Sequence, residues 1–137
     1  MIEFNFETDF TLSNSNVLAR WIEDVVVKER CSLGDVNYIF CDDAYLHKLN
    51  VSFLNHDTYT DIISFDTSMD GCISGDIFIS VERVKENAQQ YNVTFKDEMH
   101  RVMIHGVLHY LGYKDKLEED QLEMTRMENA ALSILNL

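Results

Sequence analysis

Two histidines, His105 and His109, stand at positions i and i+4 in the segment HGVLHYLGYKD of this 137-residue chain. Residues at that spacing lie on one face of a helix, with Cβ atoms about 5–6 Å apart. Their ring nitrogens can bind one metal ion at about 2.0–2.1 Å. Gly112 can end the helix and turn the chain back, so that Asp115 supplies a third ligand. We therefore predict one divalent metal ion, with Zn²⁺ the expected ion, on His105, His109 and Asp115.

The predicted ligand set indicates hydrolytic chemistry. Three protein ligands leave coordination positions open for water and substrate, and the metal would lower the pKa of bound water toward about 7. Gly106 stands where a His-Glu-x-x-His metalloprotease has its general base, which argues against a protease. Two histidines and one carboxylate also suit Fe(II), so an iron oxygenase stays open as an alternative.

The histidine segment resembles the YbeY family, metal-dependent endoribonucleases linked to ribosomal RNA maturation. That family carries His-Gly-x-Leu-His-x-x-Gly-Tyr-Asp-His, with three histidines as zinc ligands. The matching residues here are His105, Gly106, Leu108, His109, Gly112 and Tyr113. Other family signatures match upstream, in order and at the right spacing, at Leu49, Asn50, Asp57, 60–65 and 75–77. The resemblance covers most of the chain.

The resemblance implies an enzyme that hydrolyses an RNA phosphodiester with metal-activated water. It would be a single-strand-specific endoribonuclease in rRNA maturation and ribosome quality control, with His105 and His109 as catalytic residues. Its implied partners are ribosomal RNA and a ribosomal protein or the small ribosomal subunit. Asp61 and Asp76 lie in the family's strand signatures, and we expect them to position water or to hold a ligand histidine. The alternative role for both is to cap backbone groups at strand ends.

Two positions depart from the family pattern. The third histidine of the family falls on Asp115, preceded by Lys114 where the family usually has Asp. An Arg that the family has after the Leu-Asn pair is Leu54 here, and leucine cannot clamp a phosphate. His56 is a candidate substitute. Two alternatives therefore remain: a non-catalytic ribosome-assembly or binding factor that keeps the metal site, and a metal hydrolase acting on another substrate.

The net charge of −13 argues against broad affinity for nucleic acid, because phosphate binding depends on Lys and Arg. We expect RNA to bind through a local patch that includes Lys114 and Lys116, unless these lysines serve only solubility. The chain has no apolar run of about 18 residues and no secretory signal at its N-terminus. Its three cysteines, which include no Cys-x-x-Cys pair, fit reduced thiols in a cytoplasmic protein.

The hydrophobic periodicity of the sequence predicts one α+β domain over residues 1–137. This domain would have a roughly four-stranded mixed sheet and about five helices. The predicted strands are 2–6, 36–41, 61–65 and 76–80, with a polar loop over 66–75. Predicted N-terminal caps at Ser13 or Ser15, at Asp42 or Asp43, and at Thr94 mark the start of three helices. Two further helices are predicted to start at Val81 and near Glu118. The helix after Thr94 carries both histidines. Val17, Leu122 and Ile134 are among the residues expected on buried helix faces.

Overall fold

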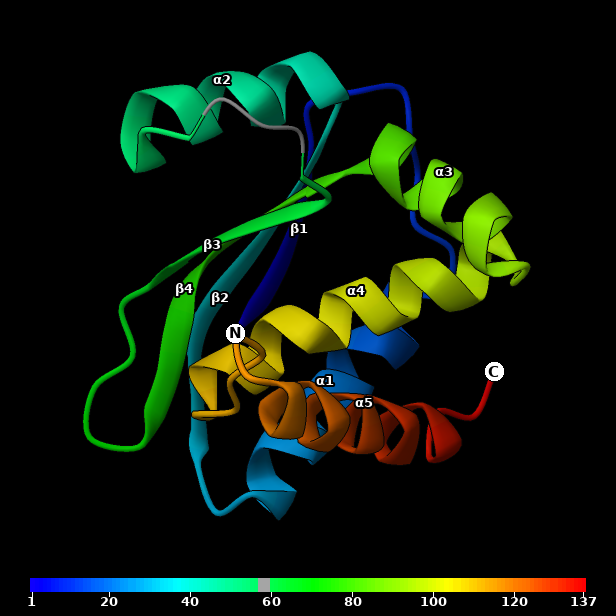
Figure 1. Ribbon diagram of the computed structural model, residues 1–137. Helices are drawn as coiled ribbons and strands as arrows, with labels where there is room; N and C mark the ends of the chain where they lie inside the picture. The colour runs from blue at the N-terminus through cyan, green and yellow to red at the C-terminus, as the bar shows by residue number, and fades with distance from the viewer. Residues whose placement is uncertain (57–59) are drawn as a thin grey trace.

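The computed structural model describes residues 1–56 and 60–137, so the signature residue Asp57 lies outside the described residues. Within that part of the chain, four strands form one mixed sheet (Figure 1). They are β1 (Ile2–Phe6), β2 (Ser32–Cys41), β3 (Ile62–Asp66) and β4 (Cys72–Ser80), in the order β1-β2-β4-β3. β1, β2 and β4 run parallel and β3 is antiparallel to β4. The predicted mixed sheet is confirmed.

Two strands start earlier than predicted. Ser32 of β2 pairs with Cys72 of β4, which extends the parallel ladder toward the start of both strands. The predicted loop over 66–75 is therefore partly wrong, because β3 continues to Asp66 and β4 already begins at Cys72. Polar residues such as Ser74 fit the strand because one face of the sheet is open to solvent at that end.

Five helices lie among the described residues: α1 (Ser15–Lys28), α2 (Asp43–Leu54), α3 (Val81–Tyr91), α4 (Phe95–Tyr110) and α5 (Glu118–Ser133). Two predicted caps are confirmed, since Asp42 and Thr94 accept hydrogen bonds from the backbone N–H groups of Tyr45 and Asp97. The predicted serine cap of α1 is wrong. Asn14 precedes that helix in the left-handed conformation, which asparagine tolerates, without a side-chain cap.

The helices cover the two faces of the sheet unequally. α1, α4 and α5 pack on one side, and α2 lies on the other (Figure 1). The main core is built from sheet residues such as Tyr38 and Ile77 and from α4 residues such as Met103 and Leu108. A smaller core under α2 contains Cys41, Leu46 and Ile63.

Three residues predicted on buried helix faces, Val17, Leu122 and Ile134, are exposed instead. Val17 lies outside the buried face of α1, which includes Leu18 and Ile22. α5 buries only a narrow stripe, represented by Met124 and Ala131. No helix in the described part of the chain combines the length and apolar character that crossing a membrane requires.

Gly106 brings α4 close to the sheet. A Cβ atom at this position would lie 3.0 Å from Cδ1 of Ile77 and 3.1 Å from Cδ1 of Ile62. A larger residue would push the helix away, since packed interiors have little spare volume. The neighbouring histidine, His105, is therefore held beside strand β3, at the edge of the sheet.

Candidate metal centre

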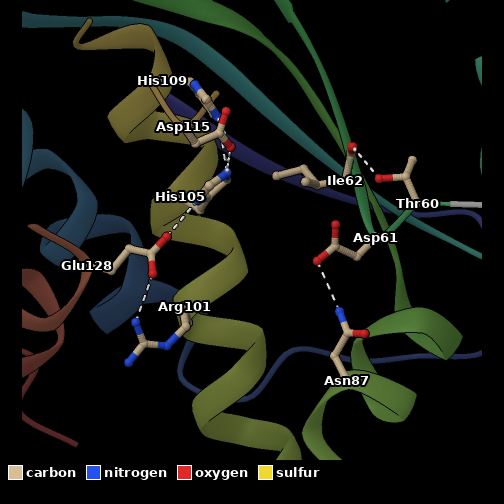
Figure 2. Close-up of polar contacts among 9 residues, drawn as sticks. All are labelled: Thr60, Asp61, Ile62, Asn87, Arg101, His105, His109, Asp115 and Glu128. Carbon is tan, nitrogen blue, oxygen red and sulfur yellow. Dashed lines mark hydrogen bonds and ion pairs between the residues drawn. The ribbon is translucent and has the colours of Figure 1, made fainter. Parts of the chain in front are cut away.

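The end of α4 and the turn after it bring the three predicted ligands together. Gly112 has a φ of 104°, and its N–H donates to the carbonyl of His109 at 3.0 Å. The next N–H, of Tyr113, donates to the carbonyl of Leu108 at 3.0 Å. These two bonds reverse the chain after the helix, as glycine at this position commonly does. Asp115 thereby returns to the face that carries His105 and His109 (Figure 2).

Three ligand atoms form a nearly equilateral triangle. Nε2 of His105 lies 3.1 Å from Nε2 of His109 and 3.3 Å from Oδ2 of Asp115, and the third side is 3.2 Å. Tetrahedral ligands at 2.0–2.1 Å from one zinc ion lie about 3.3 Å apart. Among the described residues, these three are the one group of His, Cys, Asp or Glu side chains placed to hold one ion. The arrangement fits a small divalent cation.

The proton positions also favour a cation here. Nδ1 of His105 lies 2.6 Å from Oε2 of Glu128, a partner that only accepts when ionised, so this nitrogen carries a hydrogen. In the neutral ring, Nε2 of His105 then has a lone pair, and it faces the carboxylate oxygen of Asp115. Two acceptors at that distance repel unless a positive charge lies between them, and a metal ion would supply that charge.

The charges around His105 reinforce this preference. Burial by itself lowers the pKa of the imidazole. The hydrogen bond and charge of Glu128, with the charges of Asp115 and Asp61, outweigh burial, so the pKa of His105 is raised. The surroundings of the ring therefore stabilise positive charge, whether a proton or a metal ion carries it.

A polar cavity of about 110 Å³ opens beside His105. Its lining residues are Asp61, Ile62, Glu98, Arg101, Val102, His105 and Glu128. Asp61, just before β3, faces α4 across this space, and its Oδ2 accepts a hydrogen bond from Nδ2 of Asn87 at 3.1 Å (Figure 2). Burial raises the pKa of Asp61, although backbone hydrogen bonds and the charge of His105 oppose the shift. The structure thus places Asp61 on the cavity that His105 also lines.

Asp76 does not join the centre. Its Oδ1 accepts a hydrogen bond from Nδ2 of Asn37 at 3.0 Å. The next residue of β4, Ile77, faces Gly106 of α4, and successive side chains of a strand point to opposite faces. The expectation that Asp76 holds a ligand histidine is therefore wrong, because its side chain lies on the other face of the sheet.

The remaining predicted residues lie at the surface. His56 is exposed just beyond α2, where its N–H donates to the carbonyl of Asn50 at 3.1 Å. Leu54, the last residue of α2, is also exposed. Lys114 and Lys116 are exposed on either side of Asp115. Of these four, only the lysines adjoin the three clustered ligands.

Sequence reasoning missed Glu128 and Arg101. Glu128 is buried on the stripe of α5 that also contains Met124 and Ala131, and Nη1 of Arg101 donates to its Oε1 at 2.8 Å. Glu128 follows Met124 by four residues and so shares the apolar face of α5. A charged residue on such a face is the signal in the sequence, since buried charges are usually paired. Arg101 precedes His105 by one helical turn on α4, the same spacing that drew attention to the histidines.

The buried carboxyl of Glu98 gives a pH-dependent prediction. It is 5% exposed, and burial, with the charges of Asp61 and Glu128, raises its pKa above the ordinary 4.5 against the opposing charge of Arg101. A carboxyl whose folded pKa is raised costs stability as the pH rises from its unfolded pKa through its folded pKa. We expect Glu98→Gln to add about 1 kcal/mol to the free energy of unfolding at pH 7 and little at pH 4.

Denaturant unfolding with a chelator present measures both values for Glu98→Gln and the parent chain. The chelator keeps metal binding out of the comparison. An equal effect at pH 4 and pH 7 would contradict the assignment of the cost to the ionised carboxyl.

Comparison with known proteins finds related chains along almost the whole sequence. The family model described as Endoribonuclease YbeY matches residues 3–136. A protein of the same description from Flavobacterium johnsoniae is 52% identical over 136 residues, covering 99% of this chain and 98% of that protein. One from Porphyromonas gingivalis is 42% identical over 119 residues, covering 87% and 79%. A solution structure from Thermotoga maritima is similar with a TM-score of 0.69 and 28% identity, covering 97% and 87% of the two chains.

Proposed function

Because the chain belongs to the endoribonuclease YbeY family, we propose that it is a metal-dependent endoribonuclease that hydrolyses single-stranded ribosomal RNA. The proposed metal dependence rests on the triangle formed by Nε2 of His105, Nε2 of His109 and Oδ2 of Asp115, whose sides are 3.1, 3.2 and 3.3 Å. We take residues 1–137 as one hydrolase domain built around this centre. Zinc is the proposed ion, since two imidazoles and one carboxylate suit it.

The chemistry divides between the ion and the side chains. When bound, the ion polarises a phosphoryl oxygen and makes water more acidic. His105, His109 and Asp115 hold it at the end of α4. Asp61 lines the cavity beside His105, is held there by Asn87, and orients the attacking water. Its negative charge helps to raise the pKa of His105. This carboxyl is the proposed proton acceptor, because its raised pKa makes it readier to take a proton than an ordinary Asp.

Ribosomal RNA maturation is the proposed setting, with the small ribosomal subunit or one of its proteins as partner. The chain has 24 Asp and Glu residues against 11 Lys and Arg, so its overall charge does not attract the phosphate groups of RNA. A positively charged protein partner would offset that repulsion and bring the RNA to the centre. The cytoplasm is the proposed location, consistent with the free state of Cys31, Cys41 and Cys72.

One observation favours a second function. Leu54, exposed at the end of α2, offers no charge for a phosphate where the family pattern has an Arg. The rival is a ribosome-assembly factor that binds metal and RNA without cleaving.

The two functions are separated by a cleavage assay. Purified protein is given a labelled single-stranded RNA and the same RNA annealed to its complement. We expect endonucleolytic products from the single strand, their loss after chelation and their return with Zn²⁺. Zinc-loaded protein that leaves both RNAs intact, even with small ribosomal subunits added, would overturn the nuclease proposal and support the assembly factor.

The lysines beside Asp115 give a further prediction. Lys114→Glu with Lys116→Glu should weaken binding to single-stranded RNA about tenfold at moderate salt and lower the slope of log affinity against log salt by about 1–2. A matched variant, Lys28→Glu with Lys48→Glu, makes the same change of charge on α1 and α2. Fluorescence anisotropy over a salt series measures both. Equal losses in the two double variants would show that net charge matters and the local patch does not.

A further inference from the structure

We infer that Glu128 and Arg101 are positioning residues that fix the orientation and tautomer of His105 for metal binding. The inference rests on the proposed metal site, and it adds residues from α5 and from the preceding turn of α4. Neither residue is a ligand: Glu128 reaches the centre only through the ring of His105 (Figure 2).

A continuous chain of short polar contacts carries the inference. Oε2 of Glu128 lies 2.6 Å from Nδ1 of His105, while its Oε1 accepts from Nη1 of Arg101 at 2.8 Å. Nη2 of Arg101 donates to Oδ1 of Asn129 at 2.7 Å. Glu128 is 7% exposed, so little water competes for its oxygens. Contacts between ionised groups at these distances are stronger than ordinary hydrogen bonds.

This chain determines which nitrogen of His105 is available. An ionised carboxylate can only accept, so Nδ1 must carry the hydrogen and Nε2 must keep its lone pair. Nε2 is the atom that faces His109 and Asp115. Without Glu128 the neutral ring could carry its hydrogen on either nitrogen, and its rotation would lose the contact at Nδ1. A carboxylate on the second nitrogen also makes the ligand nitrogen more basic.

Arg101 fixes Glu128 in turn. A buried carboxylate is costly unless it is paired, and Arg101 supplies the opposite charge on the oxygen that His105 leaves free. Arg101 and His105 stand one turn apart on α4, so the single carboxylate bridges two positions of that helix. The α5 helix itself is anchored by Nε1 of Trp21, which donates to the carbonyl of Ala131 at 2.8 Å. The geometry of a ligand on α4 therefore depends on the docking of α5.

The test compares Glu128→Ala, Glu128→Gln and Arg101→Met with a matched control, Glu123→Gln. Glu123 is a partly exposed residue of α5 that pairs with Arg126. Zinc affinity is measured by competition with a chromophoric chelator, and the ligand field by the absorption of Co²⁺ at the site. We expect Glu128→Ala to lose about 100-fold in zinc affinity and to change the cobalt spectrum, and Glu128→Gln and Arg101→Met to lose about tenfold. Glu123→Gln should match the parent.

A second readout needs neither metal nor activity. Nitrogen NMR of the metal-free protein, at a pH where the ring is neutral, reports which nitrogen of His105 is protonated. The parent should show hydrogen on Nδ1, and Glu128→Gln should keep part of this preference because an amide oxygen still accepts. If Glu128→Ala does not fold, the parent tautomer and the Glu128→Gln affinity still decide the question.

The possible outcomes keep this inference apart from the proposed function. Parent-like zinc affinity in Glu128→Gln, or hydrogen on Nε2 in the parent, would overturn the positioning role even if RNA is cleaved. A parent that binds zinc and never cleaves RNA would overturn the nuclease proposal, while the affinity series still tests Glu128.

Discussion

We expect His105→Ala and His109→Ala each to abolish RNA cleavage and to reduce zinc affinity by more than about 100-fold, because losing a ligand costs more than losing the hydrogen-bond partner of a ligand. Each substitution removes one corner of the ligand triangle and leaves two donor atoms. Two protein ligands hold an ion loosely, and water at the vacated position competes with substrate. His105→Ala also removes the partner of Glu128, so this variant should lose some stability as well, since a buried carboxylate is left with one partner fewer.

Bound zinc per chain by elemental analysis and the initial rate of RNA cleavage measure these losses. His56→Ala is the matched control for zinc binding, since His56 is exposed beyond α2 and is not one of the three clustered residues. It should keep the zinc content of the parent. A folded His109→Ala variant that binds zinc with the parent affinity would refute the site.

We expect Asp115→Ala to lower zinc affinity and Asp115→His to retain it. Oδ2 of Asp115 lies 3.3 Å from Nε2 of His105 and 3.2 Å from Nε2 of His109, so its removal opens one side of the triangle. We expect a loss of at least about tenfold, with cleavage falling in step as zinc is lost. The side chain is 39% exposed, which leaves room for an imidazole in its place. The histidine variant has the ligand set of the family motif.

Chelator competition on Asp115→Ala, Asp115→His and Glu119→Ala measures these effects. Glu119 is an exposed acidic residue in the first turn of α5 and controls for the loss of one negative charge nearby. Parent-like affinity in Asp115→Ala would show that Asp115 is not a ligand. Equal losses in Asp115→Ala and Glu119→Ala would assign the effect to charge alone.

Short-range patterns in the sequence determined much of the local structure. The spacing of His105 and His109 placed both on one helix face, and Gly112 marked the turn that returns Asp115. The caps at Asp42 and Thr94 follow from side chains that reach N–H groups a few residues ahead. Such features depend on residues within about one helical turn, so a single chain is enough to predict them.

Edges of elements and faces of outer helices were predicted less well. The ladder between Ser32 and Cys72 lengthens β2 and β4 because each strand end has a partner that local alternation does not reveal. Leu122 is exposed because α5 packs through a narrow stripe, and the width of that stripe depends on where its neighbours lie.

The sequence by itself predicted the cluster of His105, His109 and Asp115, the five helices and the mixed sheet, and only the tertiary structure decided what surrounds that cluster. Asp61 and Asp76 look alike in the sequence, yet the strand pleat turns Asp76 to the far face while Asp61 faces α4. Glu128, 23 residues from His105, meets it only because α5 docks against α4. Contacts between residues so far apart in the sequence depend on how whole helix faces pack. Burial of the apolar stripe of a helix drives that packing and so determines which partners the polar residues of the same stripe meet.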